Sequence, residues 1–98
     1  MSDIEFEWDP SKDRANQAAH GVSFADASTA FYDEHGLLLD DPDHSDDEER
    51  FVLLGISASL RLLVVVHCYR GDDARIRIIS ARRATRPESR DYQSQLRP

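Results

Sequence analysis

Residues 61–83 read RLLVVVHCYRGDDARIRIISARR, two runs rich in β-branched residues on either side of a Gly-Asp-Asp-Ala segment. This pattern predicts two antiparallel strands joined as a hairpin. With residues 71–74 as the loop, Arg70 pairs with Arg75 and Cys68 with Arg77. Because strands alternate their faces, the same register predicts one shared opposite face for His67, Tyr69, Ile78, Ser80 and Arg82. A slip of one residue would exchange these neighbours.

The hairpin is rich in positive charge. Its arginines are Arg61, Arg70, Arg75, Arg77, Arg82 and Arg83. Planar guanidinium groups bind phosphate oxygens in pairs. We therefore expect the hairpin to carry a phosphate-binding surface, with Arg61, Arg70, Arg82 and Arg83 contributing to it.

Length and composition predict a single domain spanning residues 1–98. With 40% hydrophobic residues the chain can form a core in spite of 32% charged residues. Cys68 is the only cysteine, which excludes an internal disulfide and is typical of a reducing compartment. The N-terminus has no signal-peptide pattern, and the apolar run 62–66 is too short to span a membrane. We expect a cytoplasmic protein without membrane contact.

Charge is unevenly distributed along the chain. Residues 1–49 contain 15 acidic and 2 basic residues (−13), whereas residues 50–98 contain 10 arginines and 4 acidic residues (+6), which sum to the net −7. This asymmetry predicts a basic functional surface on an otherwise acidic protein. The alternative is that the charges only decorate solvated faces.

The remaining elements are predicted from periodicity and capping signals. Residues 4–8 alternate as a strand. One helix starts at Asp9-Pro10 and ends at Gly21, and another starts at Ser23. Strands follow at 37–39 and 50–57, and a final helix after Thr85 is anchored by Tyr92 and Leu96. The order β-α-α-β-β-β-β-α indicates an α+β fold, an antiparallel sheet with the two N-terminal helices on one face and a short C-terminal helix.

Metal chemistry has little support in the sequence. The four histidines lack the spacing of a zinc site, and the acidic run 40–49 lacks the glycine and glutamate of a calcium loop. We therefore expect no metal and no cofactor. The remaining chemistry is metal-free cleavage of a phosphodiester, which needs a base for the 2′-hydroxyl and cations at the phosphate.

Candidate residues for such a reaction cluster around the hairpin. His67 or Glu49 is the candidate base, and Tyr69 the candidate stacking or proton-donating group. The candidate phosphate clamp comprises Arg61, Arg70 and either Arg82 or Arg83, and further RNA contacts are expected from Arg50, Arg75 and Arg77. The alternatives are that His67 is a packed, hydrogen-bonded core residue and that Tyr69 only fills the core.

Five ordered blocks of the sequence resemble one family. They are FEWDPSK (6–12), HGVSF (20–24), HSDDEER (44–50), RLLVVVHCYR (61–70) and RIRIISARRAT (75–85). Together these blocks resemble the BrnT-type toxins of bacterial toxin–antitoxin pairs. The resemblance implies a RelE-like fold and a metal-independent ribonuclease that arrests translation by cutting RNA, free or on ribosomes. It also implies neutralisation by a BrnA-type antitoxin. The antitoxin, and not the toxin itself, is then expected to bind operator DNA.

Two other functions remain open from the sequence. One is a toxin-like protein without catalysis that only binds its antitoxin. The other is a noncatalytic RNA-binding module. Loss of RNA cleavage on substitution of His67 or an arginine, with folding retained, separates the enzyme from both.

Overall fold

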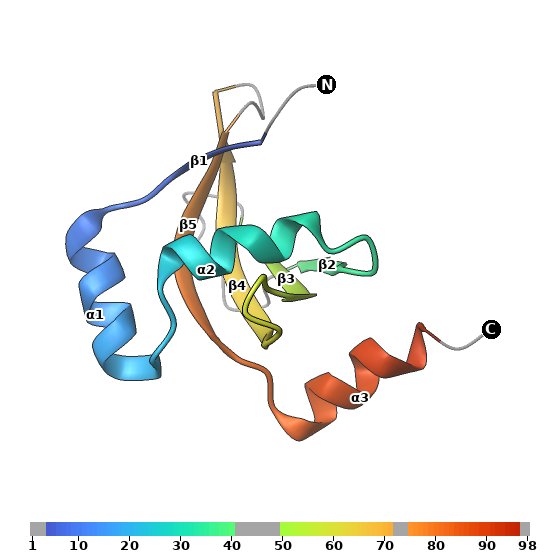
Figure 1. Ribbon diagram of the computed structural model, residues 1–98. Helices are drawn as coiled ribbons and strands as arrows, with labels where there is room; N and C mark the ends of the chain where they lie inside the picture. The colour runs from blue at the N-terminus through green and yellow to red at the C-terminus, as the bar shows by residue number, and fades with distance from the viewer. Residues whose placement is uncertain (1–3, 41–49, 72–74, 97–98) are drawn as a thin grey trace.

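The computed structural model of the protein describes residues 4–40, 50–71 and 75–96. In chain order the elements follow the predicted sequence of strands and helices (Figure 1). They are β1 (Glu5–Glu7), α1 (Pro10–His20), α2 (Phe24–Thr29), the 3-10 helix η1 (Ala30–Tyr32), β2 (Leu37–Asp40), β3 (Phe51–Ile56), β4 (Leu62–Arg70), β5 (Arg75–Arg83) and α3 (Arg86–Ser94).

The strands form one sheet in the order β1-β5-β4-β3-β2. Strands β2 to β5 pair as an antiparallel meander with β4 in the middle, which confirms the central position of the hairpin. The prediction of a purely antiparallel sheet is wrong for β1, which pairs parallel to β5. The helices α1, α2 and η1 and three strands lie between β1 and β5 in the chain, so local sequence patterns do not fix the direction of β1.

The helix boundaries confirm the predicted capping signals. The Asp9 side chain accepts a hydrogen bond from the Ser11 N–H, and α1 ends at Gly21, whose φ of +69° favours glycine. Ser23 caps α2, and Thr85 forms a complete capping box with Glu88 at the start of α3.

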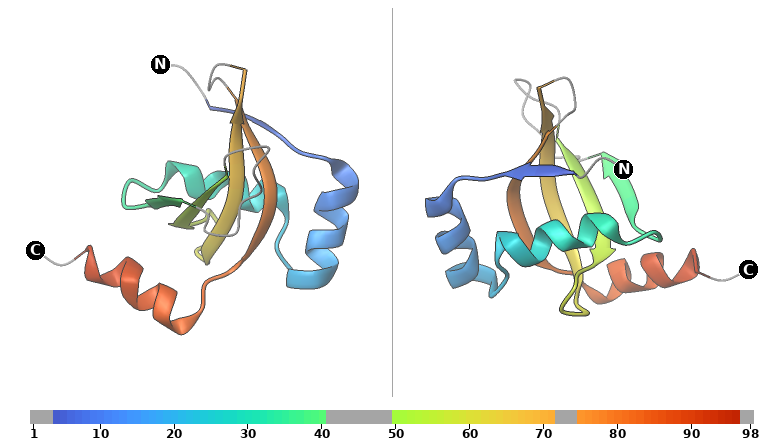
Figure 2. Two further views of the ribbon diagram at one scale, coloured as in Figure 1. Left: turned by 180° about the vertical axis from the view of Figure 1, so that it is seen from behind. Right: turned by 45° about the horizontal axis from the view of Figure 1, so that its top comes forward.

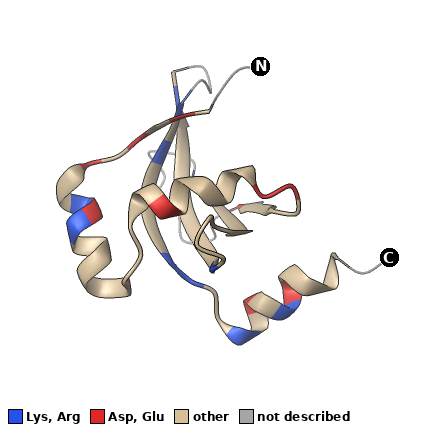
Figure 3. Cartoon of the chain, viewed as in Figure 1, with Lys and Arg blue, Asp and Glu red and all other residues tan. Residues whose placement is uncertain are grey.

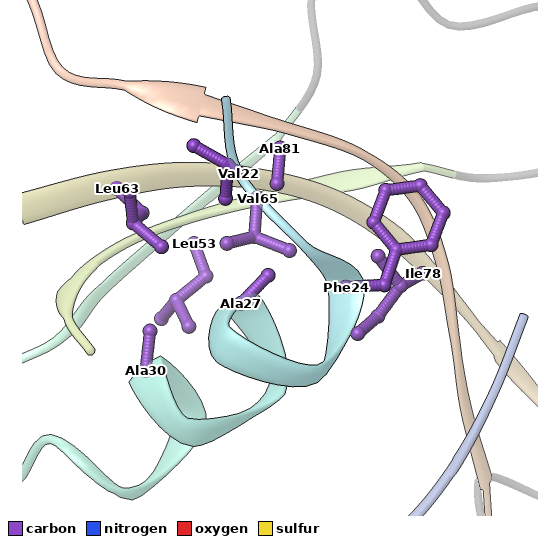
Figure 4. Close-up of a cluster of buried hydrophobic side chains, with 9 residues drawn as sticks. All are labelled: Val22, Phe24, Ala27, Ala30, Leu53, Leu63, Val65, Ile78 and Ala81. Carbon is purple, nitrogen blue, oxygen red and sulfur yellow. The ribbon is translucent and has the colours of Figure 1, made fainter. Parts of the chain in front are cut away.

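One face of the sheet, here called the α2 face, carries Leu53, Leu63, Val65, Ile78 and Ala81. It packs against Val22 and against Phe24, Ala27 and Ala30 from α2 and η1 to form the main core (Figure 4). Gly55 lets η1 approach β3, because a Cβ there would lie only 2.9 Å from the Ala30 carbonyl oxygen.

The opposite face, here called the pocket face, is only partly covered. Leu54 and Val64 pack there against Tyr92 from α3. Figure 2 shows α2 crossing the sheet and α3 at one end of it. Helix α3 therefore covers only part of the pocket face, and a pocket opens on the rest.

A bulge divides the central hairpin. Near the turn the pairing agrees with the predicted register, with Arg70 opposite Arg75 and Cys68 opposite Arg77. Between Val66 and His67 the register shifts by one residue, so Val64 lies opposite Arg82. The prediction that Ser80 and Arg82 share a face with His67 is therefore wrong, because one extra residue in β5 turns them to the pocket face.

Candidate active site

A pocket of about 450 Å³ opens on the pocket face. Its floor is apolar and consists of Leu39, Val52, Val64, Val66 and Ile79. Its polar lining consists of Asp40, Arg50, Ser80, Arg82 and Glu88. Four neighbouring strands, β5, β4, β3 and β2, thus supply the floor, and α3 adds an acidic group at one side.

Arg82 and Glu88 form a bidentate ion pair at this pocket. Nη1 and Nη2 of Arg82 donate to the two carboxylate oxygens of Glu88 at 2.8 and 2.9 Å. Hydrogen bonds from Arg82, helped by those from Thr85, lower the pKa of Glu88 to about 2, whereas Glu88 raises the pKa of Arg82. The side chains are 42% and 31% exposed, so a ligand can reach both charges.

Arg82 keeps donors available for a ligand. Its Nη1 also donates to the Arg83 carbonyl at 3.2 Å. Arginine has five N–H donors, and these oxygens use three of them. The ion pair therefore fixes the guanidinium plane and leaves further N–H groups for an anion.

Arg50 brings a second guanidinium to the pocket. Its Nε is buried and has no hydrogen-bond partner among residues 4–40, 50–71 and 75–96. A buried donor without a partner is costly unless a ligand or water satisfies it. Arg50 and Arg82 thus give the pocket the chemistry of an anion site above an apolar floor.

The position of Arg82 is fixed from the edge of the sheet. Asn16 on α1 is buried, and its Nδ2 donates to the Ala81 carbonyl at 2.8 Å while its Oδ1 accepts from the Ala81 N–H at 3.1 Å. The Asn16 side chain thus hydrogen-bonds the part of β5 that β1 does not reach, since β1 pairs only with residues 75–77. Because Ala81 precedes Arg82, this contact holds the register after the bulge.

His67 does not reach this pocket. Its ring is 0% exposed on the α2 face, with the Phe31 ring 4.7 Å away and the Tyr69 ring 5.4 Å away. Nδ1 lies 3.0 Å from the Val65 carbonyl oxygen, and Nε2 has no partner among the described residues. A role for His67 at a phosphate would require this aromatic cluster to open, whereas Tyr69 is only partly buried.

The remaining predicted arginines are dispersed. Arg61 donates to Asp26 at 2.9 Å and to the Gly21 carbonyl at 3.1 Å, which ties the β3–β4 turn to α2. Arg83 pairs opposite Leu63 and so belongs to the α2 face, and Arg70 lies at the far end of β4 from Arg61. The prediction of one positive surface formed by these arginines with Arg82 is therefore wrong, because they occupy different faces and different ends of the sheet.

Arg75 and Arg77 pair with β1. Both approach the Glu7 carboxylate, at 3.6 and 2.9 Å. Figure 3 shows basic residues along β5 and acidic ones on β1 beside it. Their charge is thus partly neutralised within the sheet, and their role in RNA binding stays a prediction.

Two other predictions concern the candidate base Glu49 and the absence of a metal site. Glu49 lies outside the described residues. Among the residues that the structure describes, no group of three or more His, Cys, Asp or Glu side chains could hold a metal ion. Glu88 was not among the predicted site residues, and its position six residues after Arg82 is the signal that could have linked the two.

The buried histidine gives the fold a predictable response to acid. Burial lowers the pKa of His67 below its ordinary value of 6.5, although the Val65 carbonyl opposes the shift. The unfolded chain therefore binds a proton more readily than the folded one, so the free energy of unfolding should decrease as pH falls below about 6.5. Denaturant unfolding at a series of pH values measures this decrease.

The matched variant is His67→Phe, which keeps an aromatic ring beside Phe31 and removes the titrating group. Its free energy of unfolding should decrease less than that of the wild type over the same pH interval. Equal decreases for both proteins would show that His67 does not control the acid response.

The fold and the pocket together define a small α+β protein with an arginine-lined pocket on one sheet face. The sequence profile of a family described as "Ribonuclease toxin, BrnT, of type II toxin-antitoxin system" matches residues 8–88. The chain belongs to this BrnT ribonuclease toxin family, and membership implies an antitoxin partner and an RNA target.

A solved structure has the same fold. It is the 1.1 Å crystal structure of the Brucella abortus ribonuclease toxin BrnT, 24% identical in sequence, with a TM-score of 0.61, covering 86% of this chain and 100% of that one. No curated protein matches the chain in sequence. Within residues 4–40, 50–71 and 75–96, the helices are too short or too polar to cross a membrane.

Proposed function

We propose that this chain is a metal-independent endoribonuclease that inhibits translation and is neutralised by a BrnA-type antitoxin. The observation that carries the proposal is the convergence of Arg50 and Arg82 on one pocket, with the Glu88 carboxylate paired to Arg82. Family membership supplies the class of activity, and the pocket supplies a place for it.

The arginines are proposed to bind the scissile phosphate. In cleavage by the 2′-hydroxyl, negative charge grows on the phosphate oxygens as the 2′-oxygen attacks and the 5′-oxygen leaves. Two guanidinium groups above an apolar floor stabilise that charge more strongly than they would in water. The floor formed by Val52, Val64 and Val66 accommodates the apolar surface of a base or ribose next to the phosphate.

Glu88 is proposed as the general base. In the free protein its carboxylate is ionised, but Arg82 holds its pKa near 2, too low for efficient proton transfer at neutral pH. A phosphate that takes hydrogen bonds from Arg82 competes with Glu88 for that guanidinium. The carboxylate then becomes more basic and can accept the 2′-hydroxyl proton as the bond between the 2′-oxygen and phosphorus forms. The bond from phosphorus to the 5′-oxygen breaks, and this oxygen takes a proton from water.

The alternative is a protein that binds RNA or its antitoxin without cleaving. The specific observation in its favour is the Arg82–Glu88 pair itself, because a carboxylate that caps α3 and neutralises an arginine also has a purely structural explanation. Binding without cleavage under single-turnover conditions would identify this alternative.

The test of the proposal is cleavage by the purified protein. Incubated with single-stranded RNA, the protein should produce 2′,3′-cyclic phosphate ends, and EDTA should leave the rate unchanged. RNA that carries 2′-O-methyl groups should remain intact because it lacks the attacking hydroxyl. Uncut RNA with and without ribosomes, or loss of cleavage in EDTA, would contradict the proposal.

A further inference from the structure

A second concave surface lies away from the arginine pocket. It is a groove of about 540 Å³ between η1, the end of β3 and α3. Its lining includes Tyr32, Asp33, Ile56, Ala58, Tyr92 and Leu96. We refer to it as the η1–α3 groove.

Exposed apolar side chains line this groove. Tyr32 is 60% exposed, Ile56 37% and Leu96 45%, although each is large enough to be buried in a core. Leu60, 85% exposed in the β3–β4 turn that follows Ala58, has a positive φ of 65°. Apolar patches of this kind on a soluble protein mark sites that another molecule covers.

The electrostatics of the groove are opposite to those of the arginine pocket. The Asp33 carboxylate accepts hydrogen bonds from the Tyr92 hydroxyl at 2.5 Å and from the Ile56 N–H at 2.8 Å. Burial would raise the pKa of Asp33, but these hydrogen bonds lower it, so the group is ionised at neutral pH. An anionic carboxylate among apolar side chains repels phosphates and attracts a cation.

We propose that the η1–α3 groove is the surface on which the antitoxin docks, through a segment that presents Lys or Arg between apolar side chains. The inference deepens the proposed function, since it rests on the existence of an antitoxin and names where and how it binds. The net charge of −7 on this chain adds long-range attraction for a basic segment.

Helix α3 connects the groove with the arginine pocket. Tyr92 and Leu96 in and after its last turn line the groove, and Gln95 hydrogen-bonds the His35 carbonyl. Glu88 in its first turn holds Arg82. A partner seated in the groove therefore contacts the same short helix that supplies Glu88 to the pocket.

The experiment compares three exposed positions by affinity for the antitoxin encoded in the same operon. The full chain carries Leu96→Lys or Tyr32→Lys in the groove, and the matched control is Leu38→Lys on β2, where the leucine is 53% exposed. Each groove variant should weaken binding at least about tenfold, as expected for central interface residues, whereas the control should bind like the wild type. Unfolding midpoints show whether each variant is folded.

Charge is tested separately at one position. Leu96→Glu removes the same side chain as Leu96→Lys but adds a negative charge, so a basic partner should tolerate it better. Equal losses for the two variants would contradict a basic segment. Wild-type affinity in both groove variants, or a loss confined to Leu38→Lys, would overturn the proposal and place the antitoxin elsewhere.

RNA cleavage in the same variants keeps the two proposals distinguishable. Leu96→Lys should cut RNA at the wild-type rate, since Leu96 lies outside the arginine pocket. Absence of cleavage by the wild-type protein would end the proposed enzymatic function while leaving the binding comparison in the groove fully interpretable.

Discussion

Arg82→Ala is expected to lower the rate of RNA cleavage by about 10²–10³-fold, the usual effect of removing one donor that stabilises transition-state charge. The loss should appear mainly in kcat under saturating RNA, because the developing charge is greater than that of the ground-state phosphate. Growth arrest on expression of the chain should be relieved accordingly. Single-turnover cleavage of a labelled RNA measures the effect directly.

The neighbouring arginine provides the control. Arg83 has the same side chain, but it pairs opposite Leu63 and belongs to the other face of the sheet. Arg83→Ala should therefore retain nearly the wild-type rate. The account fails if Arg83→Ala is the inactive variant, or if the two variants lose activity equally while both remain folded.

Glu88→Gln is expected to reduce cleavage by about 10²–10⁴-fold, the contribution typical of a general base. Gln keeps the size of the side chain and one acceptor oxygen, so α3 and Arg82 should remain near their positions. Because the pKa of Glu88 in the free protein is about 2, kcat/KM should show no acid limb from this group between pH 5 and 8. The pH profile of kcat/KM checks that second expectation.

The control for Glu88 separates catalysis from helix capping. Thr85→Ala removes the hydroxyl that caps α3, at a cost of about 1 kcal/mol in stability, and leaves the carboxylate paired with Arg82. It should lower the unfolding midpoint and retain cleavage. A Glu88→Gln variant that cuts RNA normally would restrict Glu88 to capping and to positioning Arg82.

Much of the fold could be predicted because its signals are local. Asp9, Ser23 and Thr85 cap helices through bonds to residues two or three positions away, and alternation within the strands defines the meander. The direction of β1 depends on a contact about 70 residues away, which no local pattern reports. The α+β class and the antiparallel pairing of β2 to β5 were therefore predicted correctly, the antiparallel pairing of β1 was not, and the RelE-like fold stays a prediction.

The candidate site was harder to predict because one bulge decides it. Continuous alternation would have turned Arg82 to the side of His67, but the register shift near Val66 turns it to the opposite face beside Arg50. The sequence also could not show that Arg61 forms an ion pair with Asp26. Nor could it show that Glu88 pairs with Arg82 on β5 in addition to capping α3. The residue types indicated the kind of chemistry, but the structure was needed to show which face of the sheet each side chain occupies.

The most direct test of the central claim is to observe which arginines bind RNA. The side-chain Nε–H groups of ¹⁵N-labelled arginine are followed by NMR while an RNA blocked by 2′-O-methyl groups is added. The account predicts saturable shifts for Arg50 and Arg82, with Arg61 and Arg83 unchanged. Shifts confined to Arg61 or Arg83, with Arg50 and Arg82 unaffected at saturation, would contradict it.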